Sequence, residues 1–254
     1  MTTKILNSNT ACCSIPPVLS SYEPKGTIKP YVGFQKAYVT GPEGTGRVLV
    51  GIYDIFGFFP QTQQGADILA KTLDAKVVLP DFFEPNAPFS PEDYPPDTDA
   101  KKAKLQAFFG GPADIKKAVA NVKKVGKLLK EEGYGKIGVY GYCWGGKVAT
   151  LAGDDTDFNA VAAIHPAMMD ATDAKHLAVP IALFPSKDEP KDVFEKVVAE
   201  ISSNPFASKN AYKLYDTVHH GWAAARANLE DPENKKQYED VYSRLSGFYK
   251  GVWE

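Results

Sequence analysis

One cysteine stands in a setting that suits nucleophilic chemistry. Cys143 is the centre of the run Gly-Tyr-Cys-Trp-Gly over residues 141–145, which follows an apolar run at 136–140 and precedes the start of a helical pattern at 147–151. In a turn this sharp the central residue is strained, and small residues two positions away on either side avoid steric collisions. The thiol then lies beside a helix N-terminus, whose partial positive charge favours a thiolate. We therefore interpret Cys143 as a candidate nucleophile.

An acid and a base follow at the ends of two later predicted strands. The apolar run 181–184 leads into Asp188, and the run 211–215 leads into His219 and His220. Carboxyl ends of parallel strands meet at one edge of a sheet, so the three groups are expected to lie together. Nucleophile, acid and histidine in this order along the chain are typical of the α/β-hydrolase arrangement.

Apolar runs alternate with amphipathic segments along most of the chain. Strands are predicted at 47–53, 75–79, 136–140, 160–164, 181–184 and 211–215, with an edge strand at 31–39, and helices at 61–73, 114–132 and 232–249. This alternation predicts an α/β fold, with a mostly parallel central sheet and helices on both faces. We expect a single domain over 1–254, with 1–30 as an N-terminal arm packed on the surface. The segment 81–112, rich in proline and aromatic residues, is interpreted as a lid or wall over the site.

Composition narrows the classes of partner. The 254 residues carry 29 Lys and Arg against 31 Asp and Glu, a net charge of −2, which offers no basic field for nucleic acid. Three cysteines without paired spacing argue against a disulfide scaffold or a cysteine-rich zinc site. No uncharged run reaches the length that spans a membrane. We expect a cytoplasmic protein, a monomer or homodimer, that binds a small molecule and neither nucleic acid nor membrane.

The turn at Cys143, the Asp188 loop and the His-Gly-Trp segment that starts at His220 resemble the dienelactone hydrolase family, cysteine-dependent members of the α/β-hydrolase fold. The resemblance runs from about residue 46 to the C-terminus, and the Cys-Cys pair near the start is similar to fungal members in particular. It implies that Cys143 is the nucleophile, Asp188 the triad acid and His220 the base. It further implies a hydrolase of the carboxymethylenebutenolidase type, a carboxylic ester hydrolase (EC 3.1.1) that cleaves lactones or small carboxylic esters through an acyl-thioester, without a metal or organic cofactor.

Two of these assignments have neighbouring alternatives. The family places its catalytic histidine directly before a small residue and an aromatic residue, which selects His220 over His219. The position directly after the strand and the family pattern select Asp188, although Glu189 and Asp192 lie close by in the sequence.

Further site residues are also assigned. The residue after the nucleophile, Trp144, is expected to supply one oxyanion-hole N–H. The resemblance implies that Ile55 supplies the other, and it places Asp54 where the family carries a longer glutamate that interacts with the resting thiol. It also assigns Arg226 to a substrate carboxylate, because a guanidinium binds carboxylates in a bidentate manner. Trp222 is named as a substrate contact in an apolar pocket.

Two alternative functions stay open at this stage. The chain is compatible with a non-catalytic ligand-binding member of the fold, or with a redox-responsive thiol protein that uses Cys143 or the adjacent Cys12 and Cys13. The other two histidines, His165 and His176, have no triad partner in the sequence and are interpreted as structural.

Overall fold

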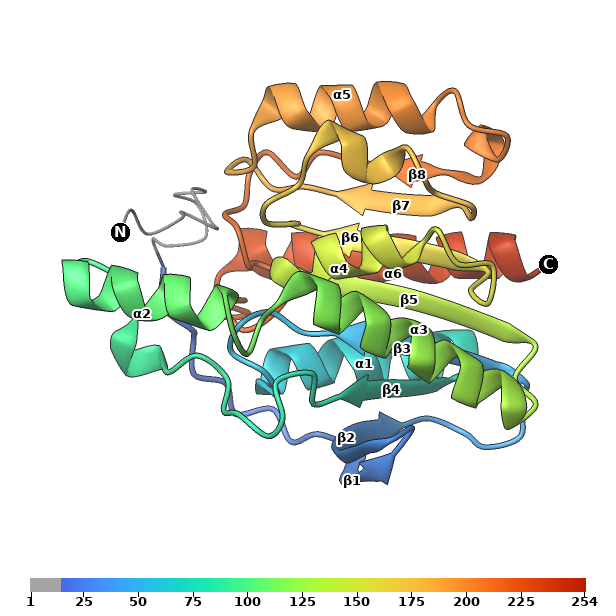
Figure 1. Cartoon of the computed structure of the whole chain (residues 1–254), viewed down its shortest axis with the longest axis horizontal. Helices are drawn as coiled ribbons and strands as arrows, with labels where there is room; N and C mark the ends of the chain where they lie inside the picture. Colours follow the sequence, from blue (N-terminus) through green and yellow to red (C-terminus); the bar gives the residue numbers. More distant parts are fainter. Residues whose placement is uncertain (1–14) are drawn as a thin grey trace.

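Eight strands lie in residues 15–254, the part of the chain that the computed structural model describes, and they form one sheet in the order β1-β2-β4-β3-β5-β6-β7-β8 (Figure 1). The strands are β1 Thr27–Tyr31, β2 Phe34–Thr40, β3 Arg47–Ile52, β4 Lys76–Pro80, β5 Lys136–Tyr142, β6 Ala160–Ile164, β7 Ile181–Phe184 and β8 Ala211–Tyr212. Pairing is antiparallel from β1 to β2 and from β2 to β4, and parallel between all later neighbours. The predicted mostly parallel sheet is therefore present. The predictions for Cys12 and Cys13 lie outside the described residues.

Helices cover both faces of this sheet. One face carries α1 (Pro60–Leu73) and α6 (Pro232–Trp253), and the other carries α3 (Ile115–Glu131), α4 (Trp144–Ala152) and α5 (Lys191–Ile201) (Figure 1). We call the two hydrophobic layers the α6-side core and the α4-side core. Within residues 15–254, no helix has both the length and the apolar composition that crossing a bilayer requires.

The alternation of side chains along β5 shows how the two layers are divided. Ile137 and Val139 lie in the α4-side core, whereas Tyr140 lies in the α6-side core. Gly138 also faces α6, and a Cβ there would lie 2.5 Å from the ring of Tyr249. The Tyr249 hydroxyl donates to the Val139 carbonyl oxygen at 2.6 Å, so α6 lies directly on the backbone of β5.

Side-chain caps explain where several helices begin. The Asp114 carboxylate accepts the N–H of Lys117 at the start of α3, at 2.8 Å, which satisfies one of the unpaired donors of the first turn. Thr98 caps α2 (Asp99–Phe109) in the same way, through the N–H of Lys101. The sequence pattern did not predict α2, because its buried residues are only Leu105, Phe108 and Phe109, and this short apolar stripe gives little helical periodicity.

Several element boundaries differ from the prediction. β5 continues to Tyr142 and α4 begins directly at Trp144, because the intervening turn is a single residue. β8 ends at Tyr212 rather than at 215, and Tyr215 keeps only an isolated bridge to Ser186. The strand β1 lies within the segment expected to be an arm.

The described part of that arm is fastened to the body of the protein. The N–H of Val18 donates to the Ala225 carbonyl oxygen at 2.9 Å, and the side-chain amide of Gln61 donates to the Val18 carbonyl oxygen at 2.8 Å. The hydroxyl of Tyr22 donates to the carboxylate of Asp67 on α1. Val18 thus connects the N-terminal segment to the loop that contains Ala225.

Substitution of Gly138 by alanine is expected to lower the free energy of unfolding by about 1–3 kcal/mol, because the added methyl group pushes Tyr249 and α6 away from β5. The matched control is Gly247→Ala within α6, where a Cβ meets nothing within 4 Å. That change should stabilise the protein by about 0.5–1 kcal/mol, since alanine loses less conformational entropy in a helix. Urea unfolding measures both values. Equal stabilities of the two variants would contradict the packing described here.

Candidate active site

Cys143 occupies the turn between β5 and α4 with a strained backbone, at φ 54° and ψ −119°. Its side chain is 1% exposed. A Cβ at Gly141 would lie 2.0 Å from the Gly145 carbonyl oxygen, and a Cβ at Gly145 would lie 2.4 Å from the Ile52 carbonyl oxygen. Backbone atoms cannot yield as a flexible side chain can, so both positions require glycine. The spacing recognised in the sequence therefore has a direct steric cause.

This close approach also brings together the loops that contain Ile55 and Trp144. Gly145 lies against the end of β3, so the loop that follows β3 is next to the first turn of α4. The predicted lid or wall contacts Ile55, and Ala113, which directly follows it, contacts Trp144. The N–H of Phe89 donates to the Ile55 carbonyl oxygen at 2.9 Å, and the indole N–H of Trp144 donates to the Ala113 carbonyl oxygen at 2.8 Å. The two residues expected to form an oxyanion hole are thus buried neighbours of the Cys143 turn.

His220 is buried beside two carboxylates that play different parts. Its Nδ1 lies 2.5 Å from Oε1 of Glu189, and its side chain is 1% exposed. Its backbone N–H donates to Oδ2 of Asp188 at 2.8 Å. The sequence prediction placed Asp188 on the imidazole, whereas the structure places Glu189 there and Asp188 on the backbone. The reason lies in the turn after β7, where the Glu189 carboxylate folds back to accept the N–H of Ser186 and so reaches the ring.

His219 has a different environment from its neighbour. It is half-buried, and its Nδ1 lies 2.9 Å from the carbonyl oxygen of His220. Burial lowers the pKa of its imidazole, and the positive charge of Arg226 acts in the same direction. The ring that contacts a carboxylate is that of His220, so the geometry favours His220 of the two adjacent histidines.

Asp54 and Arg226 place opposite charges inside the same region. Asp54 is 3% exposed and accepts the N–H of Phe56 at 3.0 Å. Burial raises the pKa of its carboxyl, while the charge of Arg226 and backbone N–H groups oppose that rise. Arg226 is 2% exposed and donates from Nη2 to the Tyr94 hydroxyl at 2.7 Å. Its guanidinium also lies 4.8 Å from the ring centre of Tyr94, within the range of cation–π attraction. Arg226 is therefore an interior residue held by the 81–112 wall.

The indole of Trp222 is fully buried in the α6-side core, with its ring centre 4.8 Å from that of Tyr215 and 5.1 Å from that of His165. Its described ring contacts are thus aromatic neighbours, and its role as a substrate contact stays a prediction. Tyr94 and Glu189 are the polar contacts that sequence reasoning did not assign, because neither position belongs to a local motif.

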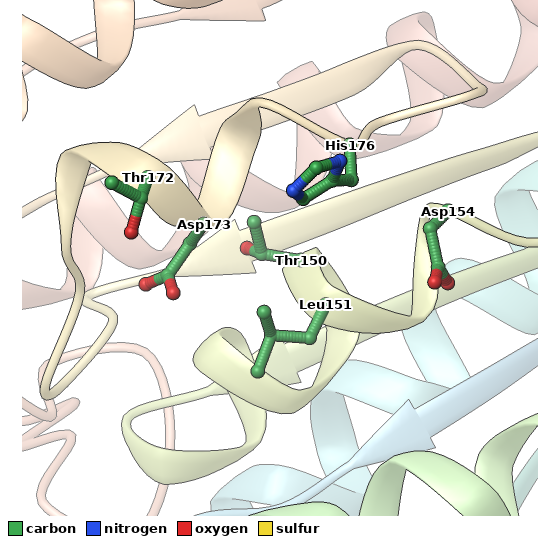
Figure 2. Close-up of a pocket in the computed structure, with 6 residues that line it drawn as sticks. All are labelled: Thr150, Leu151, Asp154, Thr172, Asp173 and His176. Carbon is green, nitrogen blue, oxygen red and sulfur yellow. The ribbon is translucent and has the colours of Figure 1, made fainter.

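A separate pocket of about 300 Å³ opens between α4 and the short 3₁₀ helix η3 (Ala171–Ala174). Figure 2 shows its lining residues, which are Thr150, Leu151, Asp154, Thr172, Asp173 and His176. None of the residues assigned to catalysis lines it. Lys147 already pairs with Asp173 at 3.0 Å. Among the described residues, no group of three or more His, Cys, Asp or Glu side chains is arranged to hold a metal ion.

The strand order, the parallel pairing and the strained turn after β5 together define an α/β-hydrolase fold. Comparison with solved structures supports this class. The chain superimposes on a dienelactone hydrolase from Anabaena variabilis with a TM-score of 0.59 and 14% identity, covering 90% of this chain and 97% of that one. The fold predicted from the sequence is confirmed.

The chain belongs to the dienelactone hydrolase family, whose model matches residues 35–252. An uncharacterised AIM2 family protein of Schizosaccharomyces pombe is 31% identical over 93% of this chain and 96% of its own length. A carboxymethylenebutenolidase homologue of Mus musculus is 29% identical over 83% of this chain and 84% of its own length. Family and fold together support a hydrolase.

Two adjacent glycines test the geometry of the Cys143 turn. Gly145→Ala is expected to lower the free energy of unfolding by about 3 kcal/mol or more, because its methyl group meets the backbone of β3. Gly146→Ala is the matched control, since its Cβ comes no closer than 3.0 Å to Pro166 and 3.3 Å to the Gly141 carbonyl oxygen, and alanine favours the helix. Its cost should stay below about 1 kcal/mol. Denaturant unfolding of both variants gives the comparison, and a larger loss at Gly146 would contradict the described packing.

Proposed function

We propose that this protein hydrolyses small carboxylic esters or lactones, with Cys143 as nucleophile, His220 as base and Glu189 as the acid that orients the base. The observation that supports this most directly is the buried contact of 2.5 Å between Glu189 and Nδ1 of His220, at the sheet edge where the Cys143 turn also lies. A carboxylate in this position holds the imidazole in one tautomer, with Nε2 available to exchange a proton. Asp188, on the backbone N–H of His220, positions the loop.

In the proposed reaction the proton of the Cys143 thiol passes to Nε2 of His220. The thiolate attacks the carbonyl carbon, and the oxygen that becomes negative accepts hydrogen bonds from the N–H groups of Ile55 and Trp144. Collapse of this intermediate breaks the ester C–O bond and leaves an acyl-thioester on Cys143. The leaving oxygen takes the proton from His220. An enolate, which an enol lactone provides, leaves first and takes that proton afterwards, so His220 is neutral again before water attacks.

The second half of the reaction restores the enzyme. A water molecule gives a proton to His220 as it attacks the thioester carbonyl. The carbon–sulfur bond then breaks, and the products are a carboxylic acid and the free Cys143 thiol. An enolate leaves without strong protonation, so enol lactones suit this thiolate mechanism in particular.

Arg226 and Asp54 support a preference for substrates that carry a carboxylate. The buried guanidinium is held by Tyr94 and by aromatic rings, and it offers a planar donor to an anion. Burial raises the pKa of the Asp54 carboxyl, and the charge of Arg226 opposes that rise. In our proposal a substrate carboxylate interacts with Arg226 and so competes with Asp54 for its charge.

Replacement of the nucleophile tests the proposed function directly. Cys143→Ala and Cys143→Ser are each expected to lower kcat/KM for aryl acetates and enol lactones by at least about 1,000-fold, because neither variant presents a thiolate. Cys13→Ser is the control for removal of a thiol elsewhere in the chain and should keep wild-type rates. Full hydrolysis by Cys143→Ala would refute the proposal, and retained binding of a lactone without turnover in the wild type would favour a ligand-binding role.

Two adjacent carboxylates allow the triad acid to be tested by a matched pair. Glu189→Gln should lower kcat/KM by about 1,000-fold or more, since the imidazole loses the charge that fixes its tautomer. Asp188→Asn should lower it only about tenfold, since the amide oxygen still accepts the His220 N–H. Steady-state kinetics on an aryl acetate measures both. The opposite order would return the role of triad acid to Asp188.

A further inference from the structure

His165 is a buried histidine for which the proposed reaction has no part. It follows β6 with 0% of its side chain exposed, and neither ring nitrogen has a hydrogen-bond partner on another residue of the described chain. A buried polar group without a partner lowers stability. Its backbone is strained as well, at φ 36°. An apolar residue would fill this position without an unpaired polar group. The presence of a histidine here therefore needs a reason other than packing.

The ring of His165 lies against the ring of His220. Their centres are 5.0 Å apart with an angle of 65° between the planes, which is an edge-to-face contact. On its other sides His165 stacks on Tyr142, at 5.7 Å and 27°, and meets Trp222 at 5.1 Å. This aromatic stack fixes the position of His165, which in turn limits the rotation of the His220 ring.

The charges around His165 decide which of the two rings holds a proton. His220, Arg226 and His219 are the positive or protonatable groups that act on it, and with burial they hold the pKa of His165 well below its ordinary value. His220 has Glu189 at its Nδ1, whereas His165 has no carboxylate in contact. His165 therefore stays neutral beside the ring that contacts Glu189.

We propose that His165 is a positioning residue that holds the ring of His220 and stabilises its positive charge while Cys143 is a thiolate. The face of a neutral aromatic ring attracts a cation that lies within about 6 Å of the ring centre, and the attraction is larger in a site without water. Histidine is also among the few residue types enriched at positive φ, which gives a backbone reason for histidine rather than phenylalanine here. The inference rests on the proposed Cys143–His220 pair.

The pH dependence of Cys143 alkylation by iodoacetamide tests this role. Loss of the ring in His165→Asn or His165→Leu removes stabilisation of the imidazolium, so the neutral thiol–imidazole form gains over the thiolate–imidazolium pair. The thiol then ionises beside an uncharged imidazole, which requires a higher pH. The midpoint of the rate profile should rise by about one pH unit, the size expected for a desolvated cation–ring contact. Asparagine tolerates positive φ, so it remains informative if the leucine variant does not fold.

Two further variants separate this role from a structural one. His165→Phe keeps a neutral ring against His220 and should keep the wild-type midpoint within about 0.3 units, since the aromatic contact is what stabilises the cation. Phe184→Leu also disturbs the α6-side core, through a residue that packs on Tyr215, and should lower stability without moving the midpoint.

Unchanged midpoints in both ring-removing variants, or a shift in His165→Phe as large as theirs, would overturn the inference. Failure of the proposed function has a different signature. In that case the wild-type profile follows an ordinary isolated thiol, and His220→Gln leaves it unchanged.

Discussion

The approach of the first turn of α4 to the end of β3 is the contact on which the site depends. It is possible only because Gly141 and Gly145 lack a Cβ. It forces Cys143 to positive φ, a conformation that costs about 1–3 kcal/mol and persists only where surrounding structure maintains it. Two hydrogen bonds do so here. The Cys143 N–H donates to Ile164, and the Cys143 carbonyl oxygen accepts from Ala167. Neighbouring strand β6 thus holds the strained turn in place.

Several ionisable side chains are buried together at this edge of the sheet. Asp54, Glu189, His220 and Arg226 are all buried. Removing such groups from water is costly unless they are paired, and here the imidazole meets Glu189 while Arg226 interacts with Asp54 and Tyr94. Buried ionisable groups with a shifted pKa, such as Asp54, concentrate at functional sites. The same loops contain the proposed oxyanion-hole residues.

Much of the fold was predictable because parallel strands covered on both faces are continuous apolar runs. β6 (Ala160–Ile164) and β7 (Ile181–Phe184) have the predicted boundaries. Elements that bury few side chains were harder to predict from the sequence. α2 was missed because few of its residues face the core, and β8 was drawn too long because Tyr215 is buried without belonging to the regular strand. A residue buried through its aromatic side chain and a residue buried within a regular strand give the same apolar pattern in the sequence.

The sequence by itself determined the turn at Cys143 and the order of the candidate groups, because the glycine pattern lies within five residues. Gly141 meets Gly145 inside that turn, whereas Gly145 meets Ile52 of β3 only in the folded chain. Only the tertiary structure decided which of two adjacent carboxylates meets the base. Asp188 and Glu189 differ by one position, and their directions depend on how the turn after β7 folds and where the loop after β8 passes it. The contact between His165 and His220 was likewise decided in three dimensions, since the two histidines lie more than fifty residues apart in the chain. Steric requirements within a turn can be inferred from neighbouring residues, whereas contacts between loops depend on the packing of the whole sheet.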